Sequence, residues 1–236
     1  MRLDKFLADA NFGTRSHVKT LIKHGFIKVN SEVIKNPSFS FDPLKEKVFY
    51  NDQLISYEEE AVFLINKPKD YICSNIDELY PSILNLLPSE LFKKLKIVGR
   101  LDVDTTGTLL ITTNGKLVNY FTHPKNSINK TYFVKVNHKI TPAMVEAVKR
   151  PIDIGKGEFS LPCELEIISD DSAKITLSEG KYHEIKRIFH AFNLEVLELD
   201  RLNIDKYSYT NYNLKQGEYY KFNEEELNDI LSLIGG

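Results

Sequence analysis

Two groups of apolar residues near the start of the chain recur at helical spacing. They predict one short helix over about residues 3–10 and a second that starts at 14–16 and ends at Gly25, a residue suited to a left-handed cap. The runs 26–30 and 33–34 then have the character of strands. We therefore expect two helices followed by a small hairpin sheet.

From residue 62 the pattern changes to longer apolar runs, typical of buried strands, separated by polar loops and helical stretches. Thr141-Pro142 has the character of a helix start, and Asn114-Gly115 that of a turn. The larger part should therefore be a largely antiparallel, mixed sheet flanked by helices, which makes the whole chain an α+β protein. The expected elements are strands 62–65, 97–98, 109–111, 130–136, 163–168, 173–178 and 196–199, and helices 141–149, about 185–192, and from 223 onward.

A polar and acidic stretch at residues 50–61 separates the two patterns. Such stretches commonly mark domain boundaries. With 236 residues and 42% hydrophobic content, the chain is long enough for a small domain beside one sizeable core. We predict a first domain at residues 1–58 and a second at residues 59–236.

The two cysteines, Cys73 and Cys163, lie far apart and show no metal-ligand spacing. They predict neither a disulfide framework nor a metal site, and a reducing compartment fits them. The chain has no apolar signal region at its start and no apolar stretch long enough to cross a membrane. We expect a cytoplasmic protein that is neither secreted nor membrane-spanning.

The formal net charge of -2 conceals an uneven distribution. Residues 1–37 hold seven Lys or Arg against three acids, a local excess of four positive charges. Some of these cations recur every fourth residue along the second predicted helix, which indicates either a solvated helix face or a surface that binds an anion. The candidate contacts are Arg2, Lys5, Arg15, Lys19, Lys23 and Lys28.

Residues 99–107, Gly-Arg-Leu-Asp-Val-Asp-Thr-Thr-Gly, form a polar loop between apolar strands. Loops on a rigid sheet often carry catalytic side chains, although composition alone is also compatible with an ordinary turn. Asp102, Asp104 and Thr106 imitate the start of a calcium-binding EF-hand loop. Thr113 stands where that loop requires a bidentate Glu, so calcium is disfavoured.

Four ordered blocks resemble motifs of the RsuA-type ribosomal RNA pseudouridine synthases. They are residues 66–74 (NKPKDYICS), 99–115, 130–132 (KTY) and 179–189 (EGKYHEIKRIF). The first 50 residues resemble the S4 domain of RNA-binding proteins, through Gly-Thr-Arg, Leu-Ile-Lys-His-Gly and Ile-Lys-Val-Asn in succession. The resemblance covers essentially the full chain, and four blocks in order are more specific than one short motif.

The resemblance implies a role for four side chains in the second domain. Asp102 matches the catalytic Asp of the family, and Lys186 matches the basic residue that pairs with it. Tyr132 matches the active-site Tyr, and Arg100 matches the Arg implicated in holding a flipped-out nucleotide. The S4 resemblance further implies that the cations of the first domain face RNA phosphates, contacts that position a protein without specifying sequence.

Each of these residues also has a simpler interpretation. Without its motif, Tyr132 would be an ordinary core aromatic, and Lys186 would belong to a solvated helix face. His183 is expected to mark a loop–helix boundary, and Asp104 to have neighbours different from those of Asp102. The chain departs from the family pattern at two positions, with Glu184 in place of Gln, which would add negative charge near the site, and Thr108 in place of Leu.

The implied reaction breaks the bond from ribose C1′ to uracil N1, turns the uracil and forms a bond from C1′ to C5. A carboxylate near C1′ can act as a nucleophile or as a base, and a nearby Lys favours its ionised form. No atoms are gained or lost, so no cofactor is expected. Because C1′ is hidden in a helix, the target must be flipped out or lie in an accessible loop.

The resemblance points to small-subunit ribosomal RNA, at position 516 of 16S rRNA, with naked RNA or an assembly particle as the partner. A large-subunit enzyme is the nearest alternative. A catalytically idle RNA-binding protein of ribosome assembly is another, and the joint presence of Asp102, Tyr132 and Lys186 argues against it. We expect a monomer that binds neither metal nor membrane.

Overall fold

In a computed structural model, the chain divides into two compact units, Met1–Glu59 and Glu60–Gly236. The structure describes residues 1–10, 12–43, 45–55, 60–89 and 94–235. The predicted domain boundary, between residues 58 and 59, lies outside the described residues. None of the helices in these ranges is both long and apolar enough to span a membrane.

In the first unit, the local sequence signals place both helices. The Thr14 side chain accepts a hydrogen bond from the backbone N–H of His17 and so caps the second helix, which buries Val18 and Ile22. The sheet has four strands in the order β2-β1-β3-β4, so the predicted hairpin is only its first half. The elements are α1 (Leu3–Asp9), α2 (Arg15–Lys23), β1 (Ile27–Val29), β2 (Glu32–Val33), β3 (Val48–Tyr50) and β4 (Gln53–Leu54).

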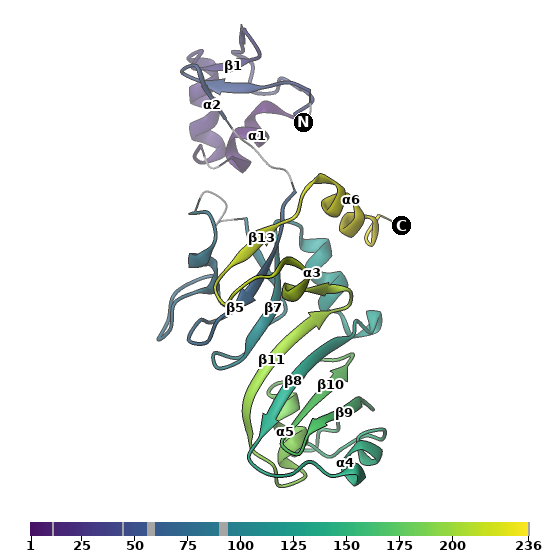
Figure 1. Ribbon diagram of the computed structural model, residues 1–236. Helices are drawn as coiled ribbons and strands as arrows, with labels where there is room; N and C mark the ends of the chain where they lie inside the picture. Colours follow the sequence, from purple (N-terminus) through teal and green to yellow (C-terminus); the bar gives the residue numbers. More distant parts are fainter. Residues whose placement is uncertain (11, 44, 56–59, 90–93, 236) are drawn as a thin grey trace. The chain divides into compact units, whose positions relative to one another are not determined.

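The second unit is built on a nine-stranded sheet, through which β11 and β8 run side by side (Figure 1). The order is β13-β5-β7-β11-β8-β10-β9, with β6 on β7 and β12 on β11. The strands are β5 (Val62–Lys67), β6 (Lys96–Val98), β7 (Thr106–Thr112), β8 (Lys130–Val136), β9 (Glu164–Ser169), β10 (Ser172–Leu177), β11 (Val196–Ile204), β12 (Tyr207–Ser208) and β13 (Tyr219–Lys221). The described pairs are antiparallel, except that β11 runs parallel to β7. The fold is therefore the expected α+β arrangement.

Helices cover this sheet, and the sequence anticipated three of them. The α-helices are α3 (Gly115–Thr122), α4 (Pro142–Ala147), α5 (Glu184–His190) and α6 (Glu224–Ser232), and the short 3-10 turns are η1 (Ile83–Leu86), η3 (Pro124–Asn126) and η4 (Tyr209–Tyr212). The turn predicted at Asn114-Gly115 is wrong. The Asn114 side chain instead accepts a hydrogen bond from the backbone N–H of Lys116 and starts α3.

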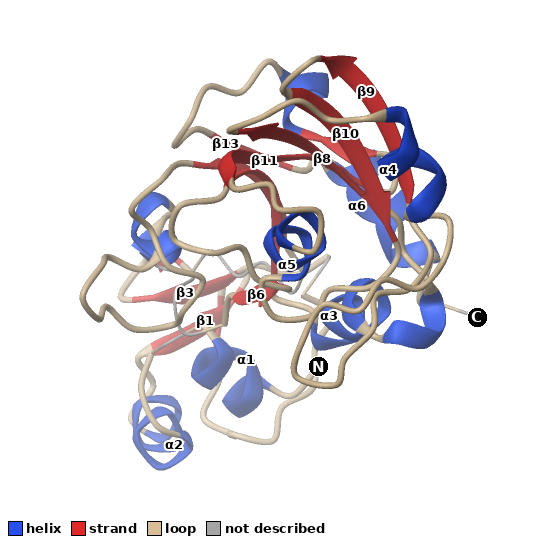
Figure 2. Ribbon diagram, turned by 90° about the horizontal axis from the view of Figure 1, so that it is seen from below, coloured by secondary structure: helices blue, strands red, loops and turns tan. Residues whose placement is uncertain are grey.

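The packing explains why β5 is a continuous apolar run. Val62 and Leu64 join a core cluster with residues of α3 and α6, whereas Phe63 and Ile65 join another with residues of η1. Both faces of the strand are thus covered. Figure 2 shows α5 beneath the curved strands β8, β10 and β11, where its apolar face joins the third core cluster of this unit.

Candidate active site

The loop between β6 and β7 carries Asp102, and the buried side chain of Lys67 holds this loop. The Lys67 ammonium, at the end of β5, is 0% exposed. It donates hydrogen bonds to the carbonyl oxygens of Thr105 (2.9 Å), Pro68 (3.0 Å) and Val103 (3.4 Å). Burial lowers the pKa of Lys67, and the charges of Cys73 and of nearby aspartates oppose that shift. Lys67 therefore ties together backbone that flanks Asp102 on its C-terminal side.

Two further contacts from residues 66–74 hold the same loop. The backbone N–H of Asp70 donates to the carbonyl of Val103 at 3.0 Å. The backbone N–H of Leu101 donates to the Cys73 sulfur at 3.3 Å. Residues 66–74 thus position the loop that carries Asp102 from both sides of this residue.

Close packing of β7 against β11 fixes the far end of the loop. Gly107, with φ +104°, lies opposite Arg201, and a Cβ at this position would stand 2.3 Å from the Arg201 carbonyl oxygen. The buried Thr108 donates its hydroxyl to the carbonyl of Leu202 (2.6 Å) and accepts from the backbone N–H of Tyr209 (3.1 Å). Thr108, which departs from the family pattern, therefore serves strand packing.

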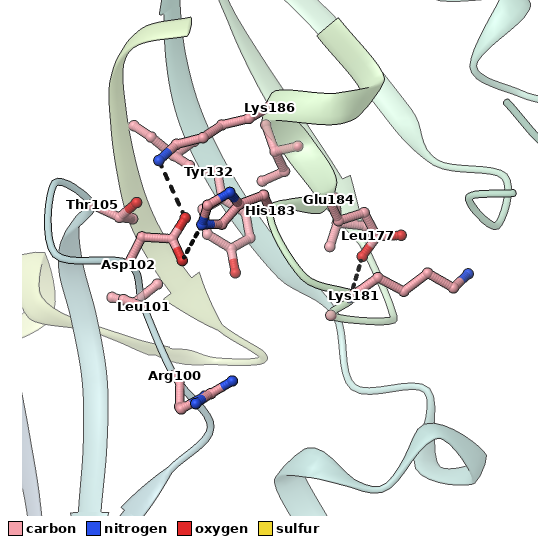
Figure 3. A pocket seen from close by; sticks show the side chains of 13 residues that line it. Arg100, Leu101, Asp102, Thr105, Tyr132, Leu177, Lys181, His183, Glu184 and Lys186 are labelled. Atoms are coloured by element: carbon pink, nitrogen blue, oxygen red, sulfur yellow. Dashed lines mark hydrogen bonds and ion pairs between the residues drawn. The ribbon is translucent and has the colours of Figure 1, made fainter. Parts of the chain in front are cut away.

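The Asp102 carboxylate lies between the side chains of Lys186 and His183, both from the segment that starts α5 (Figure 3). Lys186 Nζ is 3.2 Å from Asp102 Oδ2, and His183 Nε2 is 3.5 Å from Oδ1. His183 adopts a left-handed conformation, φ 49°, at the N-cap of α5. It is the expected boundary residue, yet the same position brings its ring to Asp102.

The expectation that Asp104 has different neighbours from Asp102 is wrong. Lys186 Nζ donates to both carboxylate oxygens of Asp104, at 2.7 and 2.9 Å. Partial burial raises the pKa of Asp104, but the hydrogen bond and charge of Lys186 outweigh it, and the net shift is downward. Burial lowers the pKa of Lys186, and its contacts with the two aspartates outweigh this and raise it. One lysine therefore serves two carboxylates, because a tight turn follows Asp102 in place of extended chain.

Tyr132, on β8, is both a core residue and a lining residue of the pocket at Asp102, which we call the Asp102 pocket. Its side chain is 7% exposed. In the sheet it lies opposite Arg201 of β11, whose guanidinium carbon is 6.0 Å from the centre of the Tyr132 ring. The Asp102 pocket is also lined by Arg100, Leu101, Thr105, Leu177, Gly180, Lys181, His183, Glu184, Ile185, Lys186 and Leu199.

Arg100 lines the pocket without joining the carboxylate cluster. Its side chain is exposed, and Figure 3 shows it separated from the Asp102–Lys186 pair. The structure thus brings Arg100, Asp102, Tyr132 and Lys186 to one pocket. Among the residues described, no group of three or more His, Cys, Asp or Glu side chains is placed to hold a metal ion.

Glu184 lies at the pocket but adds less charge than its residue type suggests. Its side chain is buried and accepts a hydrogen bond from the backbone N–H of Lys181 at 2.8 Å. Burial, followed by a hydrogen bond with Glu179, raises the pKa of Glu184 to about 7. Glu179 in turn pairs with Lys181 Nζ at 2.7 Å. Near neutral pH, Glu184 therefore holds a proton part of the time, and its protonated form resembles the neutral Gln usual in the family.

Most of the candidate RNA contacts of the first unit are exposed. Lys28 pairs with Asp52 at 2.6 Å. Arg2 donates two hydrogen bonds to the buried Asp4, and the Arg2 hydrogen bond lowers the pKa of that carboxyl. Arg2 thus has a structural partner within its own unit. The remaining four side chains, Lys5, Arg15, Lys19 and Lys23, are exposed on α1 and α2.

Sequence reasoning missed three residues of the site. Lys67 was part of a recognised motif, but nothing in the sequence showed that its ammonium turns inward. His183 stands three residues before Lys186, a spacing that places side chains on one helix face and could have indicated their proximity. Arg201 carried no local signal, because its place beside Tyr132 depends on the register of β11 with β8.

Comparisons with known proteins agree on a family for both parts of the chain. The RNA pseudouridylate synthase model matches residues 61–191, and the S4 domain model matches residues 1–43. The chain is 35% identical to the ribosomal small subunit pseudouridine synthase A of Haemophilus influenzae, over 98% of this chain and 100% of that protein. The Vibrio cholerae protein of the same name is 37% identical, over 98% of this chain and 99% of that protein.

A solved structure described as a pseudouridylate synthase matches 98% of this chain and 99% of its own, with 34% identity and a TM-score of 0.68. The family model covers more than half of the sequence, and the relatives cover nearly all of it. With the S4 domain at its start, the chain belongs to the RNA pseudouridylate synthase family.

Proposed function

We propose that this protein isomerises a uridine to pseudouridine in small-subunit ribosomal RNA, at position 516 of 16S rRNA, with Asp102 as the catalytic carboxylate. One observation carries the assignment of Asp102. Its carboxylate lies in a pocket beside Tyr132, 3.2 Å from the Lys186 ammonium. The names of the full-length relatives support the choice of RNA.

The geometry suits a reaction at C1′ of a nucleotide held in the pocket. Asp102, paired with Lys186, can attack C1′ as a nucleophile or remove a sugar proton as a base. Tyr132 can stack on the freed uracil and help move the C5 proton. Arg100, an exposed residue that lines the pocket, can hold the flipped-out nucleotide.

The exposed cations of the first unit would hold the RNA by its phosphates. Arg15, Lys19 and Lys23 follow one another at every fourth position of α2, which places them on neighbouring turns of one face. Such contacts give affinity and register, whereas the Asp102 pocket selects the nucleotide.

Release of tritium from 5-tritiated uridine tests the proposed function, because C5 loses its hydrogen when the new bond forms. We expect release from small-subunit rRNA, naked or in an assembly particle, and a modified nucleotide at position 516. Release only from large-subunit rRNA would identify the sibling activity. Tight binding without release from any of these substrates would favour an RNA-binding assembly protein.

The salt dependence of binding tests the role of the first unit. The double variant Lys19→Gln, Lys23→Gln should lower the salt slope by about 1.4 to 1.8, because each lost phosphate contact removes about 0.7 to 0.9. The control Lys45→Gln, Lys47→Gln removes the same charge from exposed residues of this unit outside α2. Equal slopes in the two double variants would refute the α2 assignment.

A further inference from the structure

A second cavity, of about 270 Å³, adjoins the Asp102 pocket. The two share Arg100, Tyr132, Gly180 and Lys181. The second cavity is further lined by Lys130 and Arg201, among others, and we call it the Arg201 chamber. The roles proposed so far do not explain why a buried cation, Arg201, and a half-buried one, Lys130, lie together there.

Arg201 is a buried cation with hydrogen-bonding capacity left over. Its side chain is 2% exposed, and its Nε donates to the carbonyl of Thr108 at 2.7 Å. Its Nη2 has no hydrogen-bond partner within the described part of the chain. A buried charged donor without a partner destabilises the fold. The unpaired Nη2 of Arg201 therefore indicates a role in binding an acceptor from outside rather than a role in stability.

Lys130, the first residue of β8, adds a second half-buried cation to the chamber. Its Nζ donates to the carbonyl of Ile128 at 3.0 Å. Burial, followed by the charge of Arg201, lowers the pKa of Lys130 to about 8, against the opposing effect of Glu184. The two cations therefore destabilise one another until something negative enters.

The acid at the chamber does not neutralise them. Glu179 lines the cavity, but it pairs with Lys181 Nζ at 2.7 Å and accepts a hydrogen bond from the backbone N–H of Leu161. Among the described residues, no carboxylate forms an ion pair with Lys130 or Arg201. Within the described residues, the two cations of the chamber thus have no paired carboxylate.

We propose that the Arg201 chamber binds a phosphodiester group of the RNA strand beside the uridine that is isomerised, with Arg201 and Lys130 as its ligands. This inference rests on the proposed function, which places that uridine in the Asp102 pocket. Every nucleotide is linked to a phosphate on each side, and the shared walls of the two cavities bring one of these within reach of the chamber. The guanidinium fork suits phosphate oxygens, and the ammonium adds a point charge.

The arrangement would make the two cavities cooperate. A phosphate held by Arg201 would also fix the cation beside the Tyr132 ring, 6.0 Å from its centre. Lys130 and Tyr132 are two residues apart on β8 and so point to the same face of the sheet. The chamber would therefore set how far the uridine enters the Asp102 pocket.

Lys130→Met tests the proposal, with Lys135→Met as its matched control. Both lysines lie on β8 and are half-buried, but Lys135 faces Glu198, at 3.9 Å, and does not line the chamber. We expect Lys130→Met to lower the salt slope of RNA binding by about 0.7 to 0.9 relative to wild type. Between 50 and 200 mM salt, the affinity of the variant should therefore fall about threefold less than that of the wild type. Lys135→Met should leave the slope unchanged.

A neutral methylphosphonate, placed in turn at the two phosphates that flank the target uridine, identifies the anion. We expect one of the two replacements to weaken binding to the wild type at least as much as Lys130→Met does. The same replacement should weaken binding to Lys130→Met less, because Arg201 alone then holds that phosphate. Equal salt slopes in the two lysine variants, or an equal methylphosphonate effect in wild type and Lys130→Met, would overturn the proposal. Since binding is measured apart from tritium release, lack of release by the wild type would refute the proposed function alone.

Discussion

Replacing Lys67 by Met tests how the first motif supports the site. Met keeps the apolar stem and removes the ammonium that donates to Thr105, Pro68 and Val103. Two of these bonds, at 2.9 and 3.0 Å, are of ordinary length, whereas the third, at 3.4 Å, is weak. The substitution therefore leaves two well-bonded carbonyls without their donor.

An unsatisfied buried carbonyl destabilises by about 1–3 kcal/mol, so two of them would amount to at most roughly 2–6 kcal/mol, and the contact with Pro68 is only partly buried. Removing a buried ammonium relieves its desolvation, which the lowered pKa of Lys67 reflects. We expect a net loss of about 2–4 kcal/mol, less than the roughly 5–15 kcal/mol of an ordinary domain, so the variant should still fold. Its kcat should fall at least about tenfold, because the turn after Asp102 loses its anchor.

Urea unfolding, monitored by circular dichroism, gives the stability. Tritium release at low temperature and without urea gives kcat. Lys96→Met is the control, since the exposed Lys96 also donates to two carbonyls, both at 3.3 Å. Its stability should change by less than about 0.5 kcal/mol. Equal stability changes in the two variants, or a normal kcat in folded Lys67→Met, would refute the anchoring role.

Three further substitutions probe the packing, the electrostatics and the ion pairs of the site. Gly107→Ala should destabilise the protein by more than about 2 kcal/mol in thermal unfolding. Gly155 also has a positive φ, +81°, but open space around an added Cβ, so Gly155→Ala should cause backbone strain alone. Equal losses of stability in the two variants would contradict the close approach of β7 and β11. Because the pKa of Glu184 is raised from 4.5 to about 7, the stability of the protein should fall as the pH rises through that window. Glu184→Gln should therefore narrow the difference in Tm between pH 5 and pH 8. An unaltered difference in Tm would contradict the pKa shift. Lys186→Met should lower kcat at least about tenfold with little loss of stability, while Asp104→Asn, which leaves Lys186 beside Asp102, should keep measurable activity. Unaltered turnover in Lys186→Met would show that another cation holds the carboxylate.

The elements that the sequence predicted well are those whose pattern is local. The alternation of residues 130–136 gave β8 with its observed bounds, and the apolar run from Val62 gave β5. The Asn114-Gly115 pair misled, because Asn followed by Gly suits both a hairpin turn and a helix N-cap, and only the following residues decide between them. The short strands β12 and β13 were missed. The partner of β13 is β5, which lies far away in the sequence, and β12 pairs with the neighbouring β11, whose apolar pattern is stronger.

The site divides in the same way. The motifs identified Asp102, Tyr132 and Lys186, and the structure brings them to one pocket. The position of Asp104 could not be inferred, because it depends on a turn closed by the Thr105 N–H on the Asp102 carbonyl at 3.1 Å. Strand register and the inward turn of a buried lysine likewise arise from tertiary packing, which no window of sequence contains.

The charge of Asp102 is the centre of the account, and Asp102→Asn tests it most directly. Asn has nearly the same shape but cannot supply the negative oxygen that either mechanism needs beside C1′. Asp170→Asn is the control, since Asp170 is also paired with a lysine, at 2.9 Å, and its side chain is 78% exposed. With 5-tritiated small-subunit rRNA, we predict no release by Asp102→Asn, normal release by Asp170→Asn and near-normal RNA retention on filters for both. Release by Asp102→Asn at the wild-type rate would contradict the assignment of the catalytic residue.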